Sequence, residues 1–416
     1  MAYVVRTVDK ELDELLTLAP AIAIDGPKGV GKTATAQRRA AATWLLDDPT
    51  QRALLEADPT FATAPPGTLL IDEWQRLPEV WDTVRRSVDR AASPGRFLLT
   101  GSATPVADVD THSGAGRILS LRMRPMTFYE RGIEQPTVSL GALIAGDDHR
   151  VTGATKVTSA DYFEAIESSG FPGIFRQHPR LRRGLLDAYL QRVIDRDLPD
   201  QGFSIRRPET FRRWLAAYAA ASSTTTSYSR ILDATTAGDG SQPAKTTTIA
   251  YRDHLSQLWL LDPVPGWSPS RNPLSRLQQA PKHQLADTGL AARILNLSAR
   301  TLATPSGSHM AGPLFESLAT MTVRVASQAA EGRVGHLRTR NGDHEVDLIV
   351  EGPDGQVLGI EVKLAASVTD ADVRHLQWLR AQLPHDTVDL LVITTGTHAY
   401  RRRDGVAVVP LALLGA

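Results

Sequence analysis

The sequence of 416 residues contains no cysteine. Disulfide scaffolds, cysteine zinc fingers, iron–sulfur clusters and thiol catalysis are therefore excluded. An excess of charge is also missing, because 46 Lys and Arg residues balance 46 Asp and Glu residues. This balance excludes a polybasic tail, although a local basic groove stays compatible with it. No apolar run approaches the roughly 18 residues of a membrane span, and charges interrupt the N-terminal segment before a signal-peptide core forms. We therefore expect a soluble, cytoplasmic protein with no membrane partner.

The composition is that of a globular protein, with 42% apolar and 22% charged residues. At one domain per 150 residues or so, the length corresponds to about 2.8 domains. The patterning changes twice along the chain and predicts an α/β multi-domain fold with three regions. Residues 1–134 alternate strands and helices, residues 135–304 are loop-rich up to about 175 and then mainly helical, and residues 305–416 form a separate small α/β unit.

A phosphate-binding loop is present in the first region. Residues 26–33 fit G-x-x-x-x-G-K-[ST] in full, after a predicted strand at 21–24 and before a predicted helix at 32–44. Backbone N–H groups of such a loop surround phosphate oxygens, and the following helix adds its positive dipole. We expect Lys32 to pair with the β- and γ-phosphates and the Thr33 hydroxyl to bind Mg²⁺. The predicted nucleotide-binding residues are Gly26, Pro27, Lys28, Gly29, Val30, Gly31, Lys32 and Thr33.

An acidic pair follows the next predicted strand, at 68–71. Asp72 would hold Mg²⁺ through water, and Glu73 would polarise the water that attacks the γ-phosphate. Parallel sheets bind ligands at the carboxyl ends of their strands, which is where this pair lies. A carboxylate base favours ATP hydrolysis over a GTP switch, and no guanine-reading NKxD tetrapeptide occurs. The sequence thus predicts an ATPase with ATP and Mg²⁺ as its ligands.

Two further features complete the predicted catalytic set. Thr100 or Ser102, after a predicted strand at 96–99, would hydrogen-bond the attacking water, although either hydroxyl equally suits a helix cap. Arg117 follows a glycine-rich turn and would reach the γ-phosphate of a neighbouring subunit as an arginine finger, which implies a homo-oligomer. A surface arginine is the alternative reading of Arg117.

The order of these motifs resembles an AAA-type ATPase family of bacteria and archaea. The similarity includes GPKGVGKTATA, LLIDEWQRLPEVWD and FLLTGSATP, later blocks such as AYLQRVIDRDL and APKHQLADTGL, and spans residues 4 to 405 or so. Members carry a C-terminal domain of unknown function. The resemblance implies an AAA-type P-loop ATPase core with a parallel sheet, a helical middle region with a winged-helix-like element, and a C-terminal restriction-endonuclease-like domain. Lys28 stands where many relatives have arginine.

The C-terminal region contains a spacing typical of PD-(D/E)xK nucleases. Asp347 is followed by Glu361 and Lys363 across a turn of good turn-forming residues. Pairing of Gly352 with Gln356 would place Asp347 opposite Glu361, and alternation would put Lys363 on the same face. Gathered carboxylates attract a divalent cation that activates water against a phosphodiester, with Lys363 orienting that water. By analogy with the related fold, Glu316 on the preceding helix would complete the metal site.

Two uses of this region stay open from sequence. In the first, ATP binding and hydrolysis drive a nuclease-like domain that acts on DNA. In the second, the protein is an ATP-gated regulator that binds DNA or a protein partner through an inactive nuclease fold. An intact metal cluster of the three carboxylates favours the first use.

Overall fold

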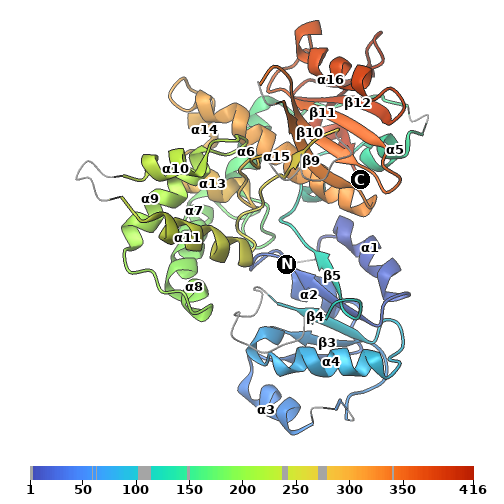
Figure 1. The fold of residues 1–416 in the computed structure, drawn as a ribbon, viewed down its shortest axis with the longest axis vertical. Coiled ribbons are helices and arrows are strands. Elements are labelled where there is room, and N and C mark those ends of the chain that lie inside the picture. Colours follow the sequence, from blue (N-terminus) through green and yellow to red (C-terminus); the bar gives the residue numbers. More distant parts are fainter. Residues whose placement is uncertain are drawn as a thin grey trace. The chain divides into compact units, whose positions relative to one another are not determined.

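The computed structural model describes residues 3–58, 60–61, 63–101, 114–147, 150–236, 242–269, 279–339 and 342–416. The chain divides into two compact units (Figure 1). The first consists of Met1–Pro125, Arg192–Ile205 and Asp253–Leu260, and the second of Met126–Gln191, Arg206–Arg252 and Leu261–Ala416. The region predicted at 135–304 is therefore shared between both units, and the division into three domains stays a prediction.

The first unit is built on a five-stranded parallel sheet in the order β2-β3-β4-β1-β5. Its strands are short and apolar, and the three central ones are almost entirely buried, as expected where helices cover both faces of a parallel sheet. The strands are β1 (Ala21–Asp25), β2 (Ala42–Leu45), β3 (Leu69–Asp72), β4 (Phe97–Thr100) and β5 (Leu119–Arg122).

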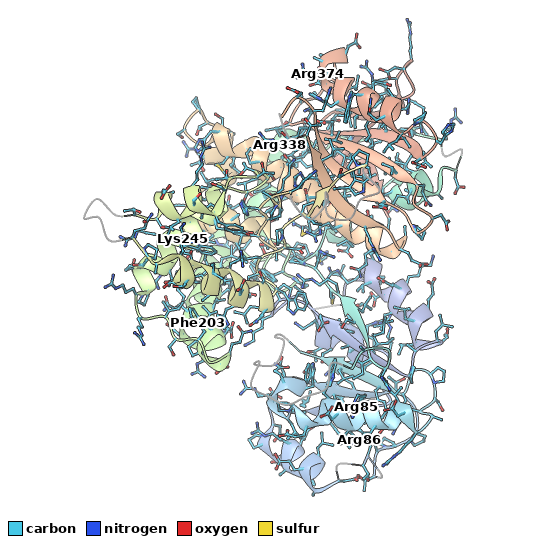
Figure 2. The ribbon with its side chains drawn as sticks, viewed as in Figure 1. Arg85, Arg86, Phe203, Lys245, Arg338 and Arg374 are labelled. Carbon is cyan, nitrogen blue, oxygen red and sulfur yellow. The ribbon has the colours of Figure 1, made fainter. Side chains whose placement is uncertain are left out.

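The helices of this unit alternate with its strands. Arg85 and Arg86, labelled in Figure 2, lie on α4, whose acidic first turn suits the helix dipole. The helical elements are α1 (Thr7–Leu16), α2 (Lys32–Gln37), α3 (Pro49–Ala57), η1 (Trp74–Arg76) and α4 (Glu79–Asp89), with η3 (Val193–Asp197) and α8 (Leu198–Asp200) from the second segment of the unit.

The predicted helix at 32–44 is wrong beyond Gln37. Ala42–Leu45 instead forms the edge strand β2, which pairs in parallel with β3. The alanine-rich stretch favours a helix locally, but ladder hydrogen bonds to β3 and packing of Trp44 on Phe61, at a ring distance of 5.8 Å, outweigh that preference.

The second unit contains most of the remaining helices. The expectation of a loop-rich stretch between 135 and 175 is wrong in part, since α5 and α6 lie there, and α6 carries a capping box at Thr158 and Asp161. Among the described residues between about 175 and 304, helices predominate, as expected. The helices up to that point are η2 (Tyr129–Arg131), α5 (Leu140–Ala145), α6 (Ser159–Ser168), α7 (Pro179–Arg192), α9 (Pro208–Ala220), α10 (Tyr228–Ala234), α11 (Lys245–Gln257), α13 (Thr288–Ile294) and α14 (Ala299–Leu302).

An eight-stranded mixed sheet organises the rest of this unit, in the order β7-β13-β14-β12-β11-β10-β9-β8. Within the region that the sequence predicts as a small α/β unit, α15 is followed by three strands (β9, β10 and β11), a helix (α16) and a further strand (β12). The elements are β6 (Val138–Ser139), β7 (Gly153–Ala154), β8 (Gly266–Trp267), α15 (Ser308–Ala329), β9 (Arg333–Arg338), β10 (Glu345–Glu351), β11 (Val357–Val362), α16 (Asp370–Gln382), β12 (Thr387–Thr394), β13 (His398–Arg401), β14 (Ala407–Pro410), η4 (Leu411–Leu413) and β15 (Leu414–Gly415).

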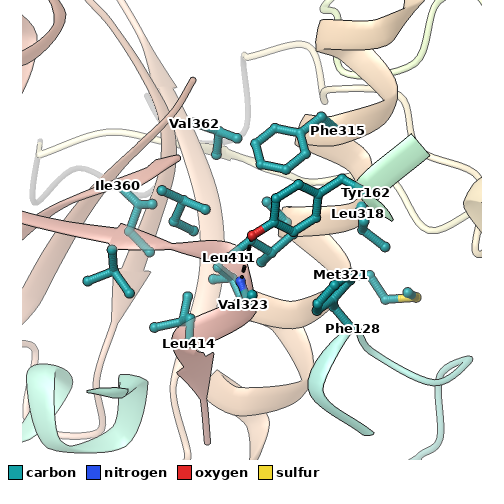
Figure 3. Close-up of a cluster of buried hydrophobic side chains, with 14 of the residues drawn as sticks. Phe128, Tyr162, Phe315, Leu318, Met321, Val323, Ile360, Val362, Leu411 and Leu414 are labelled. Carbon is teal, nitrogen blue, oxygen red and sulfur yellow. Dashed lines mark hydrogen bonds between the residues drawn. The ribbon is translucent and has the colours of Figure 1, made fainter. Parts of the chain in front are cut away.

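The central strands of this sheet are apolar on both faces. Leu391 and Ile393 of β12 join the core that includes α15, whereas Leu390 and Val392 join the core that includes α16. In the first core, Tyr162 lies between Phe128 and Phe315 at ring distances of 5.0 and 5.2 Å (Figure 3). The Tyr162 hydroxyl accepts a hydrogen bond from the Ala412 N–H at 3.0 Å.

Both edges of the sheet are formed by residues from before position 305. β7 pairs with β13, and β8 pairs with β9. The C-terminal sheet therefore depends on short strands that the sequence analysis assigned to the middle region. Within the described residues, no helix combines the length and the apolar character that a membrane crossing requires.

Candidate functional site

The backbone of the phosphate-binding loop depends on its glycines. Gly29 and Gly31 adopt φ values of 81° and 104°, which side chains other than glycine rarely allow. At Gly26 a Cβ atom would lie 2.1 Å from the carbonyl oxygen of Met123, so only glycine fits beside the end of β5. The loop joins the carboxyl end of β1 to the first residue of α2, as predicted from the motif.

Lys32 lies inside this loop and is 7% exposed. Its Nζ atom donates hydrogen bonds to the carbonyl oxygens of Gly26 and Pro27, at 2.7 and 2.9 Å. Burial lowers the pKa of Lys32 to about 8, against the attraction of Glu73, Asp25 and Asp72. A buried ammonium held only by carbonyl oxygens and nearby carboxylates is well placed to gain from an incoming polyanion.

Asp72 connects two strands of the sheet and the first turn of α2 at one point. Its Oδ1 atom accepts a hydrogen bond from Thr33 Oγ1 at 2.9 Å and another from Thr100 Oγ1. Thr100 is placed for this contact because β4 lies between β1 and β3, in register with Ile24 and Asp72. The structure thus brings together the P-loop threonine, the acidic strand end and the predicted sensor threonine.

Glu73 adopts the left-handed conformation, with φ 53° and ψ 43°. Non-glycine residues in this region are strained, and such strain concentrates at functional positions. Its Oε2 atom accepts a hydrogen bond from Gln75 Nε2, so the first turn of η1 fixes the carboxylate. The sequence analysis did not assign a role to Gln75, which is two residues from the predicted base.

Ser102 lies outside the described residues. Arg117 is described, and its Nε atom lies 2.9 Å from Asp89 Oδ1 of the same chain. It precedes β5, whose first residue, Leu119, pairs with Ile22 near the start of β1. Arg117 therefore lies at the amino ends of the strands, whereas the P-loop follows the carboxyl end of β1.

One contact of the P-loop was not expected from sequence. Lys28 Nζ lies 2.5 Å from Asp197 Oδ1, and the Asp197 side chain is 10% exposed. Asp197 belongs to η3, a π-helical turn that continues α7. The pair is separated by 169 residues, so only the fold could have indicated it.

These residues fit a nucleotide with Mg²⁺. Thr33 and Asp72 offer the hydroxyl and carboxylate oxygens that Mg²⁺ prefers, and Lys32 offers a buried cation beside them. Gly29 and Gly31 adopt the positive φ values of a loop whose backbone N–H groups can surround phosphate oxygens. Thr33, Asp72 and Lys32 would therefore hold the metal and the phosphates.

In the second unit, the predicted hairpin between β10 and β11 has the expected register. The Gly352 N–H donates to the Gln356 carbonyl at 2.8 Å, and Leu348 pairs with Ile360. Continuing this register sets Asp347 opposite Glu361, and burial and then the charge of Asp347 act to raise the pKa of the Glu361 carboxyl group.

Lys363 is on the same face as Glu361. Its Nζ atom lies 2.9 Å from Glu361 Oε2. The side chains of Asp347, Glu361 and Lys363 are thus gathered as the sequence analysis expected.

Lys282 completes this cluster and was missed by the sequence analysis. Its side chain is 1% exposed, and Nζ lies 2.9 Å from both Glu316 Oε1 and Asp347 Oδ1. Glu345 Oε1 lies 3.7 Å away, and Arg338, labelled on β9 in Figure 2, approaches the other Glu345 oxygen at 3.9 Å. No local pattern signals Lys282, because its partners are 34 and 65 residues distant.

Burial and mutual repulsion perturb the carboxyl groups of this cluster. Desolvation, and then the charge of Asp347, raise the pKa of Glu316 to about 8 and that of Glu361 to about 9. The pKa of Asp347 is lowered instead: burial acts to raise it but is outweighed by Lys282, the Val362 N–H and Lys363. Among the described residues, no three Asp, Glu, His or Cys side chains are placed to hold a metal ion.

Comparison with protein families supports the assignment of the first unit. A sequence-family model described as an AAA domain matches residues 19–131. Together with the P-loop between β1 and α2, this match supports an AAA-type P-loop ATPase, with ATP binding and hydrolysis as its general activity. Two models described as domains of unknown function match residues 159–301 (DUF8612) and 311–414 (DUF4143). Neither description names a fold or an activity, so the nuclease-like and winged-helix-like character of these regions stays a prediction.

Two uncharacterized proteins are similar to nearly the whole chain. They come from Mycobacterium tuberculosis and Mycobacterium bovis, and each is 26% identical over 416 residues, covering 97% of this chain and 83% of the relative. The similarity extends through all the regions described above.

Solved structures give weaker likenesses. A Walker-type ATPase of Pyrococcus abyssi has a TM-score of 0.38 at 15% identity, covering 69% of this chain and 94% of that one. A structure of Drosophila ORC bound to DNA has a TM-score of 0.25 at 14% identity, covering 66% of this chain and 90% of that one. Both scores are below 0.5, so neither likeness supports an inference about this chain.

Proposed function

We propose, from the AAA domain at residues 19–131, that this chain is a Mg²⁺-dependent ATPase that couples its nucleotide state to its C-terminal α/β region. The observation that carries the proposal is the meeting of Thr33, Asp72 and Thr100 beside the buried ammonium of Lys32. Hydroxyl, carboxylate and ammonium groups converge here on the loop that the P-loop motif assigns to phosphates.

Each residue has a defined part in this proposal. The P-loop N–H groups and Lys32 bind the β- and γ-phosphates, and Thr33 and Asp72 would hold Mg²⁺. Bound there, Mg²⁺ would neutralise charge on the phosphate oxygens. Glu73 accepts a proton from the attacking water, and Thr100 orients the Asp72 carboxylate.

Two substitutions test the ATPase. Lys32→Ala removes the cation on the phosphates and is expected to abolish ATP hydrolysis and weaken ATP binding. Glu73→Gln keeps the shape of the side chain but removes the base, so ATP should still bind while turnover falls by about a hundredfold or more. Lys10→Ala is the matched control, because the Lys10 side chain is 88% exposed on α1. Normal turnover in folded Lys32→Ala protein would contradict the proposal.

For the C-terminal region we propose a restriction-endonuclease-like fold. The succession from α15 to β12 and the shared face of Asp347, Glu361 and Lys363 support it. DNA is the partner that this fold suggests, and the helical region at 135–304, with its proposed winged-helix-like element, is the coupling element between nucleotide site and DNA.

A second candidate function is that of a nucleotide-gated regulator which binds DNA or protein without cutting. The position of Lys282 between Glu316 and Asp347 favours this candidate over a nuclease. Incubation of plasmid DNA with purified protein and Mg²⁺ or Mn²⁺, with and without ATP, separates the two. Cleavage that is lost in Asp347→Asn protein would establish the nuclease.

A further inference from the structure

The carboxylate cluster of the second unit already holds a cation of the chain itself. Lys282 Nζ lies 2.9 Å from one oxygen of Glu316 on α15 and 2.9 Å from one oxygen of Asp347 on β10. The main-chain carbonyl oxygen of Asp347 is 3.4 Å from the same atom. An ammonium has three hydrogen-bond donors, and these three oxygens use all of them. The oxygens of the cluster therefore satisfy all the hydrogen-bond donors of the Lys282 ammonium.

The lysine is fixed by its backbone as well as by its side chain. The Lys282 N–H donates to the Val264 carbonyl and the Val264 N–H donates to the Lys282 carbonyl, both at 2.9 Å. The next residue, His283, donates its backbone N–H to the Thr224 carbonyl at 2.9 Å. Withdrawal of the ammonium by a backbone shift would break these bonds inside a buried segment, which is costly. Lys282 is therefore a built component of the cluster.

Two further carboxylate oxygens of the cluster have partners within the protein too. Asp347 Oδ2 accepts a hydrogen bond from the Val362 N–H at 3.0 Å, and Glu361 Oε2 lies 2.9 Å from Lys363 Nζ. Mg²⁺ requires oxygen ligands at about 2.0–2.1 Å in near-octahedral geometry. A cation that bridges these oxygens of Glu316 and Asp347 at that distance would lie next to Lys282 Nζ, which is 2.9 Å from the same two oxygens, and would be repelled by it. The residues present do not fit a divalent cation.

We propose that Lys282 takes the place of the divalent cation in this nuclease-like unit, so that the cluster of Glu316, Asp347 and Glu361 binds no metal and cleaves no phosphodiester. The cluster then joins α15, β10 and the segment at 280–284 through a buried charge network, which is strongly destabilised when one member is removed. The proposal concerns the second unit alone and makes no use of the ATPase assigned to the first.

Removal of the lysine should convert the cluster into a metal site. Lys282→Ala leaves Glu316 and Asp347 facing each other without a counter-charge, which is the arrangement that attracts a divalent cation. We would titrate Mn²⁺ into nucleotide-free protein by calorimetry, with Asp72→Ala in every sample to eliminate binding at the P-loop. Protein with Lys282 should show no saturable Mn²⁺ site in the second unit, and Lys282→Ala should bind one Mn²⁺ per chain.

Three comparisons sharpen this test. Lys282→Ala combined with Asp347→Asn should lose the new Mn²⁺ site, which places the site at the cluster. Lys245→Ala, on α11 (Figure 2), replaces an exposed lysine of the same unit and should gain no site. In thermal unfolding, Lys282→Ala should be less stable than wild type and should recover part of the difference on addition of Mn²⁺.

Two results would overturn the proposal. One is a Mn²⁺ site in protein with Lys282 intact that disappears in Asp347→Asn, and this measurement does not depend on the folding of any Lys282 variant. The other is a folded Lys282→Ala protein that binds Mn²⁺ no better than its parent. ATP hydrolysis, measured in parallel without the Asp72→Ala background, should be unaffected by Lys282→Ala, so failure of the ATPase proposal is recognised separately.

Discussion

Lys28 of the P-loop forms an ion pair with Asp197 of η3, with Nζ and Oδ1 2.5 Å apart. The pair attaches the nucleotide-binding loop to the second segment of the first unit, Arg192–Ile205. Lys28 is 41% exposed, so solvent screens the attraction and its contribution to stability is modest.

We expect a double-mutant cycle of Lys28→Ala and Asp197→Ala to give a coupling free energy of about 0.5–1 kcal/mol. Urea unfolding of the two single variants and the double variant measures it. Salt should reduce the coupling, because one partner is partly exposed. A coupling of zero at low salt would show that the two side chains do not interact in solution.

A second prediction concerns the pH dependence of ATP binding. Because burial lowers the pKa of Lys32 to about 8, this lysine is increasingly neutral in the nucleotide-free protein above that pH. The phosphates favour its charged form, so binding should take up a proton and the affinity should fall by up to about tenfold per pH unit above pH 8 or so.

Calorimetry with a non-hydrolysable ATP analogue, in two buffers of different ionisation enthalpy, measures this proton uptake. Lys32→Arg is the control. Because arginine stays charged over this pH range, the variant protein should bind the ATP analogue without taking up a proton. An affinity for the wild type that is unchanged between about pH 7 and about pH 9 would contradict the low pKa.

The third prediction tests Thr100 as the residue that orients Asp72. Thr100→Val keeps the volume of a side chain that is 1% exposed but removes the hydroxyl that donates to Asp72 Oδ1. We expect ATP to bind with unchanged affinity and turnover to fall about tenfold or more. Thr83→Val on α4 is the matched control, because Thr83 is also buried and donates to a helix carbonyl. Equal rates of ATP turnover in the Thr100→Val and Thr83→Val proteins would show that the Thr100 hydroxyl does not contribute to catalysis.

The fourth prediction concerns Arg117. Because it precedes the amino end of β5, whereas its own P-loop follows the carboxyl end of β1, we expect any contact with a γ-phosphate to be with that of another subunit. Arg117→Ala should bind ATP normally but lose hydrolysis, and mixing it with Glu73→Gln protein should restore part of the activity. In the mixture, some interfaces between subunits would combine the intact Glu73 of an Arg117→Ala subunit with the intact Arg117 of a Glu73→Gln subunit.

Asp89→Ala provides the control for this experiment. It removes the intrachain partner of Arg117, 2.9 Å away, but leaves the arginine in place. Its turnover should stay close to that of the wild type. If Arg117→Ala hydrolyses ATP normally, the arginine is a surface residue paired with Asp89.

The local parts of the nucleotide site could be predicted because they are encoded in consecutive residues. The P-loop requires glycines at fixed places for its backbone conformation, and Asp72 directly follows an apolar strand. The register of the β10–β11 hairpin was predictable for the same reason, since a short turn fixes which residues oppose each other. Glu361 and Lys363 then share a face by simple alternation.

Errors arose where distant segments compete with local preference. Residues 42–45 follow an alanine-rich helix, and their local sequence predicts that the helix continues through them. In the structure they form β2 instead, because they pair with β3. The boundary at 305 was drawn from composition, whereas the sheet takes its edge strands from residues 153–154 and 266–267. Pairing across such distances leaves no periodicity in the sequence.

The sequence by itself determined which polar groups gather at the two candidate sites: Lys32, Thr33 and Asp72 in one unit, and Asp347, Glu361 and Lys363 in the other. Only the tertiary structure decided what surrounds them. Lys282 enters the carboxylate cluster from a segment 65 residues before Asp347, and Asp197 reaches the P-loop from 169 residues beyond Lys28. A charge acts through space over a few ångströms, so its effect depends on which chain segments the fold brings within that range, and spacing along the chain does not record it.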